Sequence, residues 1–531
     1  MKKTLLFATM LIAFAGKAQL RLVSDLRPGF QSSTPTSFFV YDGKLFFSAT
    51  VAGGRYVCST DGTNTGTEYV RFDNPTTGTP AVNTNGTTLF YEYNGNLYFD
   101  ARVNSTANVQ IVKLTGASNA VSSIFDLTNS TSSQSSRFTE TFGLNDKLLF
   151  NSYIPYTAMV LDLQNSANSG FLNSSMPSTS NPKEFTVLGT NCFFASSNSA
   201  NGRELWKTDG TSAGTTLYLD INAGATTSDP KSLNILGSQL TFVATHATYG
   251  KELFKTNGTG SLILLKDINP SGDSTPSFAT VIGSLLYFGA DNGTIGRELW
   301  TSAGTTLSTL LVKDINPVGD SNPSLFTKAG NIIYFTANDG TNGIELWKTD
   351  GTASGTLLVK NINPTGDSSP SNLVVYNGKL YFVANNGTNG AELWVSDGTD
   401  VGTTLVADVN PGASSSTIAE LTVFNNELYF GADANGGIGK ELYAYMDPAL
   451  NTNQFVLNGK SVRVYPNPSN NYFQISSEAV VEKVALYSIQ GQLVKSFEKQ
   501  EKYDVSDLAK GVYLIKIYGE DCSISKQIIV E

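Results

Sequence analysis

Six glutamates recur inside short apolar segments, and their carboxylates are the first candidates in this sequence for acid–base or cation chemistry. Burying an unpaired charge is costly, so each must be paired, hydrogen-bonded or placed at a strand end. Recurrence favours a structural role, in which each glutamate fastens one repeat unit to the backbone or a hydroxyl group of its neighbour. The alternative is a ring of carboxylates that attracts cations. The six are Glu204, Glu252, Glu298, Glu345, Glu392 and Glu441.

Tryptophans and aspartates accompany these glutamates. Exposed tryptophans stack on sugars, but these alternate with apolar neighbours, so burial between units is the favoured interpretation. The aspartates begin Asp-Gly-Thr turns, which are interpreted as hairpin connections. The tryptophans are Trp206, Trp300, Trp347 and Trp394, and the turns begin at Asp61, Asp209, Asp350 and Asp397.

One segment has the donor spacing of a calcium loop. Oxygen donors stand at alternate positions, Asp267, Asn269, Ser271 and Asp273, with Gly at the sixth position. The twelfth position is Phe278 rather than glutamate. Turn chemistry explains the same residues without metal. Calcium therefore stays open as an alternative, and no other cofactor is expected.

Enzymatic chemistry has little support. His246 is the only histidine, and it lies just past an expected strand. Neither a nucleophile elbow nor a phosphate-binding loop is present. A carboxylate pair of the kind that hydrolyses glycosides would depart from the repeat, and no such pair stands out. No catalytic residue is assigned, and an enzyme is not the favoured hypothesis.

The elements that must position these residues form a repeat. An aromatic-rich strand such as Leu380-Tyr381-Phe382 recurs nine times at a spacing of about 47 residues, which is typical of β-propeller blades. The sequence pattern within each unit predicts three or four short strands. Units of this size cannot bury both sheet faces alone and must stack.

The ends of the array favour a closed ring. The array opens with Arg21-Leu22-Val23-Ser24-Asp25, which matches the third strand of a unit, and ends at Glu441-Leu442-Tyr443, which matches the second. The first segment can therefore complete the last blade and hide both edges. The prediction is an all-β chain, with a closed β-propeller of about nine blades over residues 19–446 and eight blades as the alternative.

The repeat region resembles the bacterial ELWxxDGT-repeat proteins. The matching segments are Glu204 to Thr211, Glu345 to Thr352 and Glu392 to Thr399, and the resemblance is strong over residues 201–446. This family name describes a repeat and implies no activity.

Composition and the N-terminus indicate export. Gly and aromatic residues are plentiful, which favours strands and turns, and the net charge of -10 argues against nucleic-acid binding. Lys2 and Lys3 precede an apolar run that ends in small residues, which predicts a signal peptide over residues 1–18. No other apolar run is long enough for a transmembrane helix. Cys58, Cys192 and Cys522 are too few for a disulfide framework.

After a predicted linker at residues 447–461, residues 462–531 predict five to seven short strands in a small β-sandwich. They resemble the type A C-terminal sorting domain of the type IX secretion system. The matching positions include Pro466, Asn467, Pro468, Gly491, Gly511, Tyr513 and Lys526. The resemblance implies the type IX machinery as partner, with export to the periplasm followed by release or display outside the cell.

The leading hypothesis is therefore an extracellular or surface-displayed propeller that binds an unknown glycan, matrix component or protein. One rival is a secreted carbohydrate-active enzyme with its catalytic residues in the irregular units between Asn74 and Ser180. The other is a structural surface protein without a specific ligand.

Overall fold

The computed structural model describes residues 19–531 apart from short gaps. These gaps are residues 29–30, 52–53, 73–78, 83–88, 103–108, 117–119, 127–137, 153–156, 166–168, 173–179, 435–438, 448–453, 458–459, 466–468, 470, 478–479, 489–491, 520–522 and 531. Every regular element in the described ranges is a β-strand, so the prediction of an all-β chain is confirmed. Among these residues no helix is long and apolar enough to cross a membrane.

The chain divides into two compact units, one spanning Leu20–Ala444 and the other containing the residues from Tyr445 onward. The first unit holds nine sheets, numbered here in chain order. The first sheet contains β2 (Thr36–Tyr41), β3 (Lys44–Val51), β4 (Gly54–Thr60) and β5 (Glu68–Tyr69). The second contains β7 (Tyr91–Tyr93), β8 (Asn96–Ala101), β9 (Gln110–Thr115) and β10 (Ala120–Asp126), with β6 (Arg71–Phe72) parallel to β10. The third contains β11 (Phe138–Leu144), β12 (Lys147–Ser152), β13 (Thr157–Asp162) and β14 (Gly170–Phe171).

The next five sheets are regular. The fourth contains β15 (Lys183–Leu188), β16 (Asn191–Asn198), β17 (Gly202–Thr208) and β18 (Thr216–Leu219). The fifth contains β19 (Lys231–Leu236), β20 (Gln239–His246), β21 (Gly250–Thr256) and β22 (Ile263–Lys266). The sixth contains β23 (Ser277–Ile282), β24 (Leu285–Asp291), β25 (Arg297–Ser302) and β26 (Leu310–Lys313). The seventh contains β27 (Ser324–Ala329), β28 (Ile332–Asn338), β29 (Ile344–Thr349) and β30 (Leu357–Lys360). The eighth contains β31 (Ser371–Tyr376), β32 (Lys379–Asn385), β33 (Ala391–Ser396) and β34 (Thr404–Ala407).

The ninth sheet combines the two ends of the repeat region. It contains β35 (Ala419–Phe424), β36 (Glu427–Asp433) and β37 (Lys440–Met446), and β1 (Gln19–Ser24) lies beside β37 as its fourth strand. Side chains strengthen this pairing, because Arg21 forms an ion pair with Glu427 and donates to the Tyr429 hydroxyl at 3.1 Å. The N-terminal segment that begins at Arg21 therefore completes the last sheet, as predicted.

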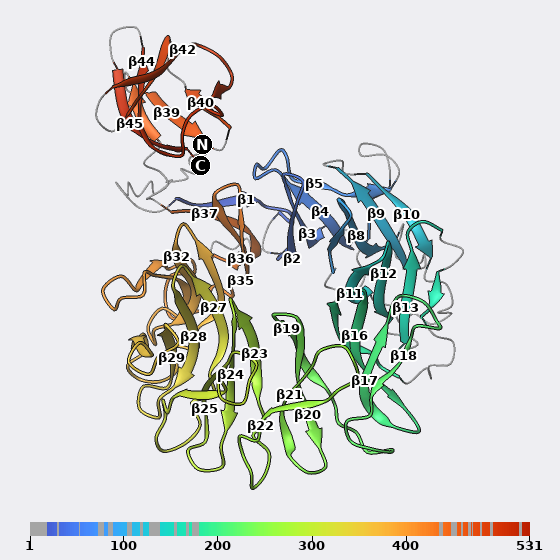
Figure 1. Cartoon of the computed structure of the whole chain (residues 1–531). Helices are drawn as coiled ribbons and strands as arrows, with labels where there is room; N and C mark the ends of the chain where they lie inside the picture. The colour runs from blue at the N-terminus through green and yellow to red at the C-terminus, as the bar shows by residue number, and fades with distance from the viewer. Residues whose placement is uncertain are drawn as a thin grey trace, which may run out of the picture. The chain divides into compact units, whose positions relative to one another are not determined.

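Successive sheets pack face to face, and the core lies between them. Figure 1 shows the nine sheets following one another around a common centre, and the first strands of neighbouring sheets contact each other, including β2 with β35. The aromatic-rich second strands are buried on both faces, as in β32, where Leu380 to Ala384 are all buried. Side chains on the two faces of each second strand pack into two different hydrophobic clusters. Phe335, for example, packs with Tyr287 of the preceding sheet.

A bulge recurs in the first strand of eight of these sheets, where the register with the second strand shifts. One residue in each bulge has a positive φ, a conformation that is uncommon for residues other than glycine. Because the bulge recurs at the same position, it is a feature of the repeat and not of one site. These residues are Ser37, Glu140, Glu184, Ser232, Phe278, Leu325, Asn372 and Glu420.

The C-terminal unit consists of two four-stranded sheets. One contains β38 (Gln454–Leu457), β39 (Lys460–Tyr465), β40 (Tyr472–Ser477) and β43 (Tyr503–Asp504). The other contains β41 (Lys483–Ser488), β42 (Leu493–Glu498), β44 (Gly511–Tyr518) and β45 (Ser523–Val530). Both contribute to one core, which includes Val464, Phe473, Leu486 and Ile515.

The strand count differs from expectation at the start of this unit. The predicted linker, residues 447–461, contains β38 and the first residues of β39, which pair antiparallel. The strand was not predicted because this segment is polar. A short edge strand pairs through backbone hydrogen bonds, which do not require an apolar pattern.

Candidate functional site

The recurring glutamates are fully buried and hold the loop that leads to the next sheet. In the seventh sheet, the Glu345 carboxylate accepts hydrogen bonds from Ile362 N–H at 3.0 Å, Asn363 N–H at 3.2 Å and the Ser368 hydroxyl at 2.6 Å. Equivalent bonds to Glu204 come from Ile221 and Ser228. Burial raises the pKa of these carboxyl groups, and for Glu441 it raises the pKa to about 7. A ring of solvent-facing carboxylates is therefore not formed by these residues.

The tryptophans pack within the repeat, and the Asp-Gly-Thr turns are held by their own hydrogen bonds. Trp300, Trp347 and Trp394 are buried, and Trp206 is half-buried. The Asp397 carboxylate accepts hydrogen bonds from the hydroxyl and backbone N–H of Thr399, and these bonds lower the pKa of Asp397. Asp209 and Asp350 make the same turn with Thr211 and Thr352, respectively.

In the predicted calcium loop, protein groups already use side-chain oxygens of Asn269 and Asp273. Asn269 Oδ1 accepts from the backbone and hydroxyl of Ser271, and Asp273 Oδ1 accepts from Lys251 N–H at 2.7 Å. Asp267 Oδ1 is buried without a hydrogen-bond partner. In the part of the chain that the structure describes, no three His, Cys, Asp or Glu side chains are grouped to hold a metal ion. Calcium stays a prediction.

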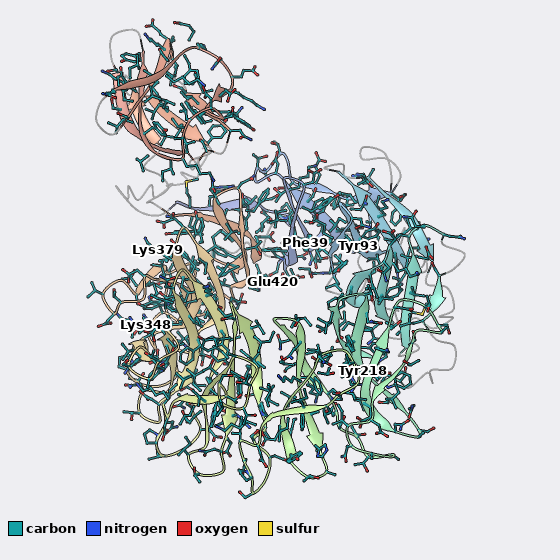
Figure 2. All side chains as sticks on the ribbon, viewed as in Figure 1. Phe39, Tyr93, Tyr218, Lys348, Lys379 and Glu420 are labelled. Carbon is teal, nitrogen blue, oxygen red and sulfur yellow. The ribbon has the colours of Figure 1, made fainter. Side chains whose placement is uncertain are left out.

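A different set of glutamates, not singled out by the sequence, links the first strands of neighbouring sheets. Glu420 accepts from Phe38 N–H at 2.9 Å, and Figure 2 shows Glu420 on the inner side of the sheets. Glu140 accepts from Glu184 N–H, and Glu184 accepts from Ser232 N–H. The three belong to bulges that recur in the repeat, so their bonds are explained by blade-to-blade fastening.

One polar cavity of about 580 Å³ lies between the second and third sheets. Its lining includes amide, hydroxyl, ammonium and carboxylate side chains. The lining residues are Asn94, Asn96, Tyr98, Lys113, Ser123, Ile124, Leu161, Asp162, Leu163 and Gln164. Beside it, Asn94 donates to Asp146 at 2.9 Å, and Asp146 N–H donates to the hydroxyl of Tyr93, which is labelled in Figure 2.

At the junction between the seventh and eighth sheets, which is regular, side chains and a turn occupy the space that corresponds to the cavity. Tyr334 and Lys348 are opposite each other on β28 and β29. Lys348 (Figure 2) donates to the Gly398 carbonyl of the next sheet at 2.7 Å, and the Tyr334 hydroxyl hydrogen-bonds Ser396. A Cβ on Gly398 would lie 2.8 Å from the Tyr334 hydroxyl, so the turn needs glycine to pack this closely.

At the junction between the fifth and sixth sheets, Lys255 makes the equivalent bond to the Gly304 carbonyl at 2.7 Å, although Thr241 stands opposite it in place of a tyrosine. A lysine and a turn glycine from successive sheets thus meet at two regular junctions. The bond satisfies an ammonium group that lies partly out of water.

At the cavity, the serine and the turn glycine that bond Tyr334 and Lys348 have no equivalent. Tyr98 and Lys113 occupy the places of Tyr334 and Lys348, opposite each other on β8 and β9. By register, Leu161 stands at the position of Ser396, and Leu163 therefore stands at the position of Gly398. Among the described residues, neither the Tyr98 hydroxyl nor the Lys113 ammonium group has a hydrogen-bond or ion-pair partner. The Ser-Asp-Gly-Thr turn of the eighth sheet has no counterpart in the third sheet at this cavity.

The sequence carried a signal for this site that sequence reasoning missed. Leu161-Asp162-Leu163-Gln164 replaces a turn that reads Ser-Asp-Gly-Thr in the eighth sheet. Departures from the local rules of a fold are expected at functional sites. The partners of Tyr98 and Lys113 lie in the neighbouring unit, so the consequence becomes visible only once the sheets are packed.

The sorting-motif positions are described in part. Gly511 begins β44, and Tyr513 donates from its hydroxyl to the Ala509 carbonyl at 2.7 Å. Lys526 lies in β45, opposite Ile515. Pro466, Asn467, Pro468 and Gly491 lie outside the described residues, as do the signal peptide and Cys522.

Comparison with known proteins bears on the C-terminal unit. Residues 463–531 match the family model of the secretion system C-terminal sorting domain. The tail is a type IX sorting domain. A protein with this tail is secreted cargo, exported to the cell surface or the extracellular space. Comparison with curated proteins gives no match.

Among solved structures, the chain is similar to a puromycin-hydrolyzing peptidase from Mycobacterium tuberculosis, at 11% identity and a TM-score of 0.36. That match covers 72% of this chain and 58% of the peptidase. The β-propeller domain of the Trilobed protease from Pyrococcus furiosus matches at 11% identity and a TM-score of 0.33, covering 60% of this chain and 98% of that domain. Neither similarity bears on activity.

Proposed function

We propose that the protein is an extracellular or surface-displayed binding protein, delivered by type IX secretion, whose repeat region is a closed nine-bladed propeller of the ELWxxDGT kind. Nine sheets and the position of β1 beside β37 support this architecture. Export through the inner membrane would use the signal peptide, residues 1–18, before the sorting domain acts.

The ligand-binding site we propose is the cavity between the second and third sheets, and the ligand class is a glycan. The observation that carries this proposal is the pair formed by Tyr98 and Lys113. Among the described residues their polar groups line the cavity without a protein partner, unlike those of Tyr334 and Lys348 at the junction between the seventh and eighth sheets. Pockets with a few convergent polar groups are the usual places for ligands. Asn94, Asn96 and Gln164 add amide groups suited to hydroxyl-rich ligands.

The rival hypothesis of a glycoside-cleaving enzyme has less support at this cavity. Such enzymes normally use two carboxyl groups on either side of the scissile bond. Asp162 is the one carboxylate among the lining residues that the structure describes. The hypothesis of a purely structural protein gives no role to Tyr98 and Lys113, the polar groups that line the cavity.

Glycan-array binding by the purified full chain tests the proposal, with calcium and with chelator in parallel. We expect saturable binding to a restricted set of saccharides. Hydrolysis of an arrayed saccharide would favour the enzyme instead. A blank array under both conditions would overturn the glycan proposal and leave a protein partner or a structural role.

A further inference from the structure

We infer that the cavity selects an acidic saccharide, with the carboxylate of a uronic acid residue bound by Lys113 and Tyr98. This inference rests on the proposed glycan-binding function and adds the charge of the ligand.

Lys113 provides the positive charge. Its side chain is half-buried on β9, between Tyr98 on β8 and Ser122 on β10. Lys255 and Lys348 satisfy their ammonium groups with turn carbonyls of the next sheet, whereas Lys113 has none. The Lys113 ammonium group is therefore free to form a charge-assisted hydrogen bond with an anionic ligand in the cavity.

Tyr98 provides a hydrogen-bond donor beside this charge. Only 2% of the residue is exposed, and burial raises the pKa of its hydroxyl, so the proton is retained at neutral pH. Leu161 stands at the position of Ser396, which bonds the equivalent hydroxyl of Tyr334, so the Tyr98 hydroxyl lacks that partner. A carboxylate has two oxygens and can accept from the Lys113 ammonium and the Tyr98 hydroxyl at once.

The remaining lining favours a sugar over a simple anion. Asp162 also lines the cavity, and its Oδ1 accepts from the backbone N–H groups of Gln164 and Asn165 at 3.0 Å each. The Asp162 carboxylate can also accept hydrogen bonds from sugar hydroxyls. The amide groups of Asn94 and Asn96 give further contacts for hydroxyls. One acidic group surrounded by hydroxyls, as in a uronic acid, matches this mixture.

The test uses the full chain and two sets of probes: hexuronate oligosaccharides from galacturonan, alginate and hyaluronan, and their carboxyl-reduced counterparts. Calorimetry measures affinity for both sets. We expect binding to at least one acidic oligosaccharide, with the reduced form bound roughly 10- to 100-fold more weakly, as for the loss of a hydrogen bond to a charged group. Lys113→Met should give the same loss, and Tyr98→Phe a smaller one.

Lys348→Met is the matched control, since it removes an equivalent lysine at a junction without the cavity and should leave affinity unchanged. A second variant restores the regular turn by combining Leu161→Ser, Leu163→Gly and Gln164→Thr. This repaired chain should give Tyr98 and Lys113 their protein partners, keep its thermal midpoint and lose binding.

The outcomes separate the two proposals. Equal affinity for acidic and reduced forms, or unchanged binding in Lys113→Met, would overturn the inference while the glycan-binding function stands. Binding of neither form by a folded chain, together with a blank glycan array, would overturn both.

Discussion

Glu441 belongs to the set of buried glutamates and joins the two ends of the repeat region. Its carboxylate accepts from Leu26 N–H at 3.1 Å, Ser33 N–H at 2.8 Å and the Ser33 hydroxyl at 2.6 Å. Burial is the main cause of its raised pKa, which is about 7, against an ordinary value of 4.5. Between these two pH values the folded chain holds a proton that the unfolded chain has released.

The contribution of this proton to stability is complete below pH 4.5 and is lost as the pH rises through 7, because the unfolded chain then binds fewer protons than the folded one. We expect the free energy of unfolding to fall by up to about 3 kcal/mol from this group over that range. Glu441→Gln cannot titrate and should show a flatter profile. Thermal midpoints of both proteins, measured from pH 4.5 to 8, check this. Parallel profiles would show that Glu441 does not titrate in this range.

At the scale of elements, β1 matters more than its six residues suggest. It covers the edge of β37, and an uncovered edge strand offers its backbone groups to other chains. The ion pair of Arg21 with Glu427 is partly exposed and contributes little by itself.

Deleting Gln19–Ser24 should therefore lower the thermal midpoint by several degrees and cause self-association, measured by light scattering. Arg21→Ala, which keeps the strand, should remain monomeric with a midpoint within about 2 °C of the parent. A monomeric deletion variant with an unchanged midpoint would show that β1 does not complete the ninth sheet in solution.

The loop from Asp267 to Asp273 is a second test at this scale. Because Asn269 and Asp273 already accept hydrogen bonds from the protein, we expect chelator to shift the thermal midpoint by less than about 1 °C. Ligands that bind only the folded state raise the midpoint, and the rise grows with the logarithm of ligand concentration relative to Kd. A drop of several degrees in chelator, reversed by calcium and absent in Asp267→Asn, would establish a metal site.

At the scale of the whole molecule, the sorting domain decides where the protein functions. Its two sheets enclose a core of their own, which includes Val484 and Ile517. A chain truncated before residue 462 should accumulate in the periplasm of the native host, while the full chain reaches the medium or cell surface. Fractionation and immunoblotting measure this. Normal secretion of the truncated chain would contradict a sorting role for the tail.

The sequence by itself determined the β-repeat, the use of β1 in the last sheet and the sorting tail. These depend on local patterns such as Leu380-Tyr381-Phe382 and on motifs contiguous in the chain. Only the tertiary structure decided that Glu345 is buried against the loop of its own unit, that β38 lies in a polar segment and that Tyr98 and Lys113 line a cavity. The physical reason is distance along the chain: Lys348 and Gly398, which bond across a junction, are 50 residues apart. The hydrogen-bond partner of such a polar group is therefore set by the packing of neighbouring sheets and not by the adjacent sequence.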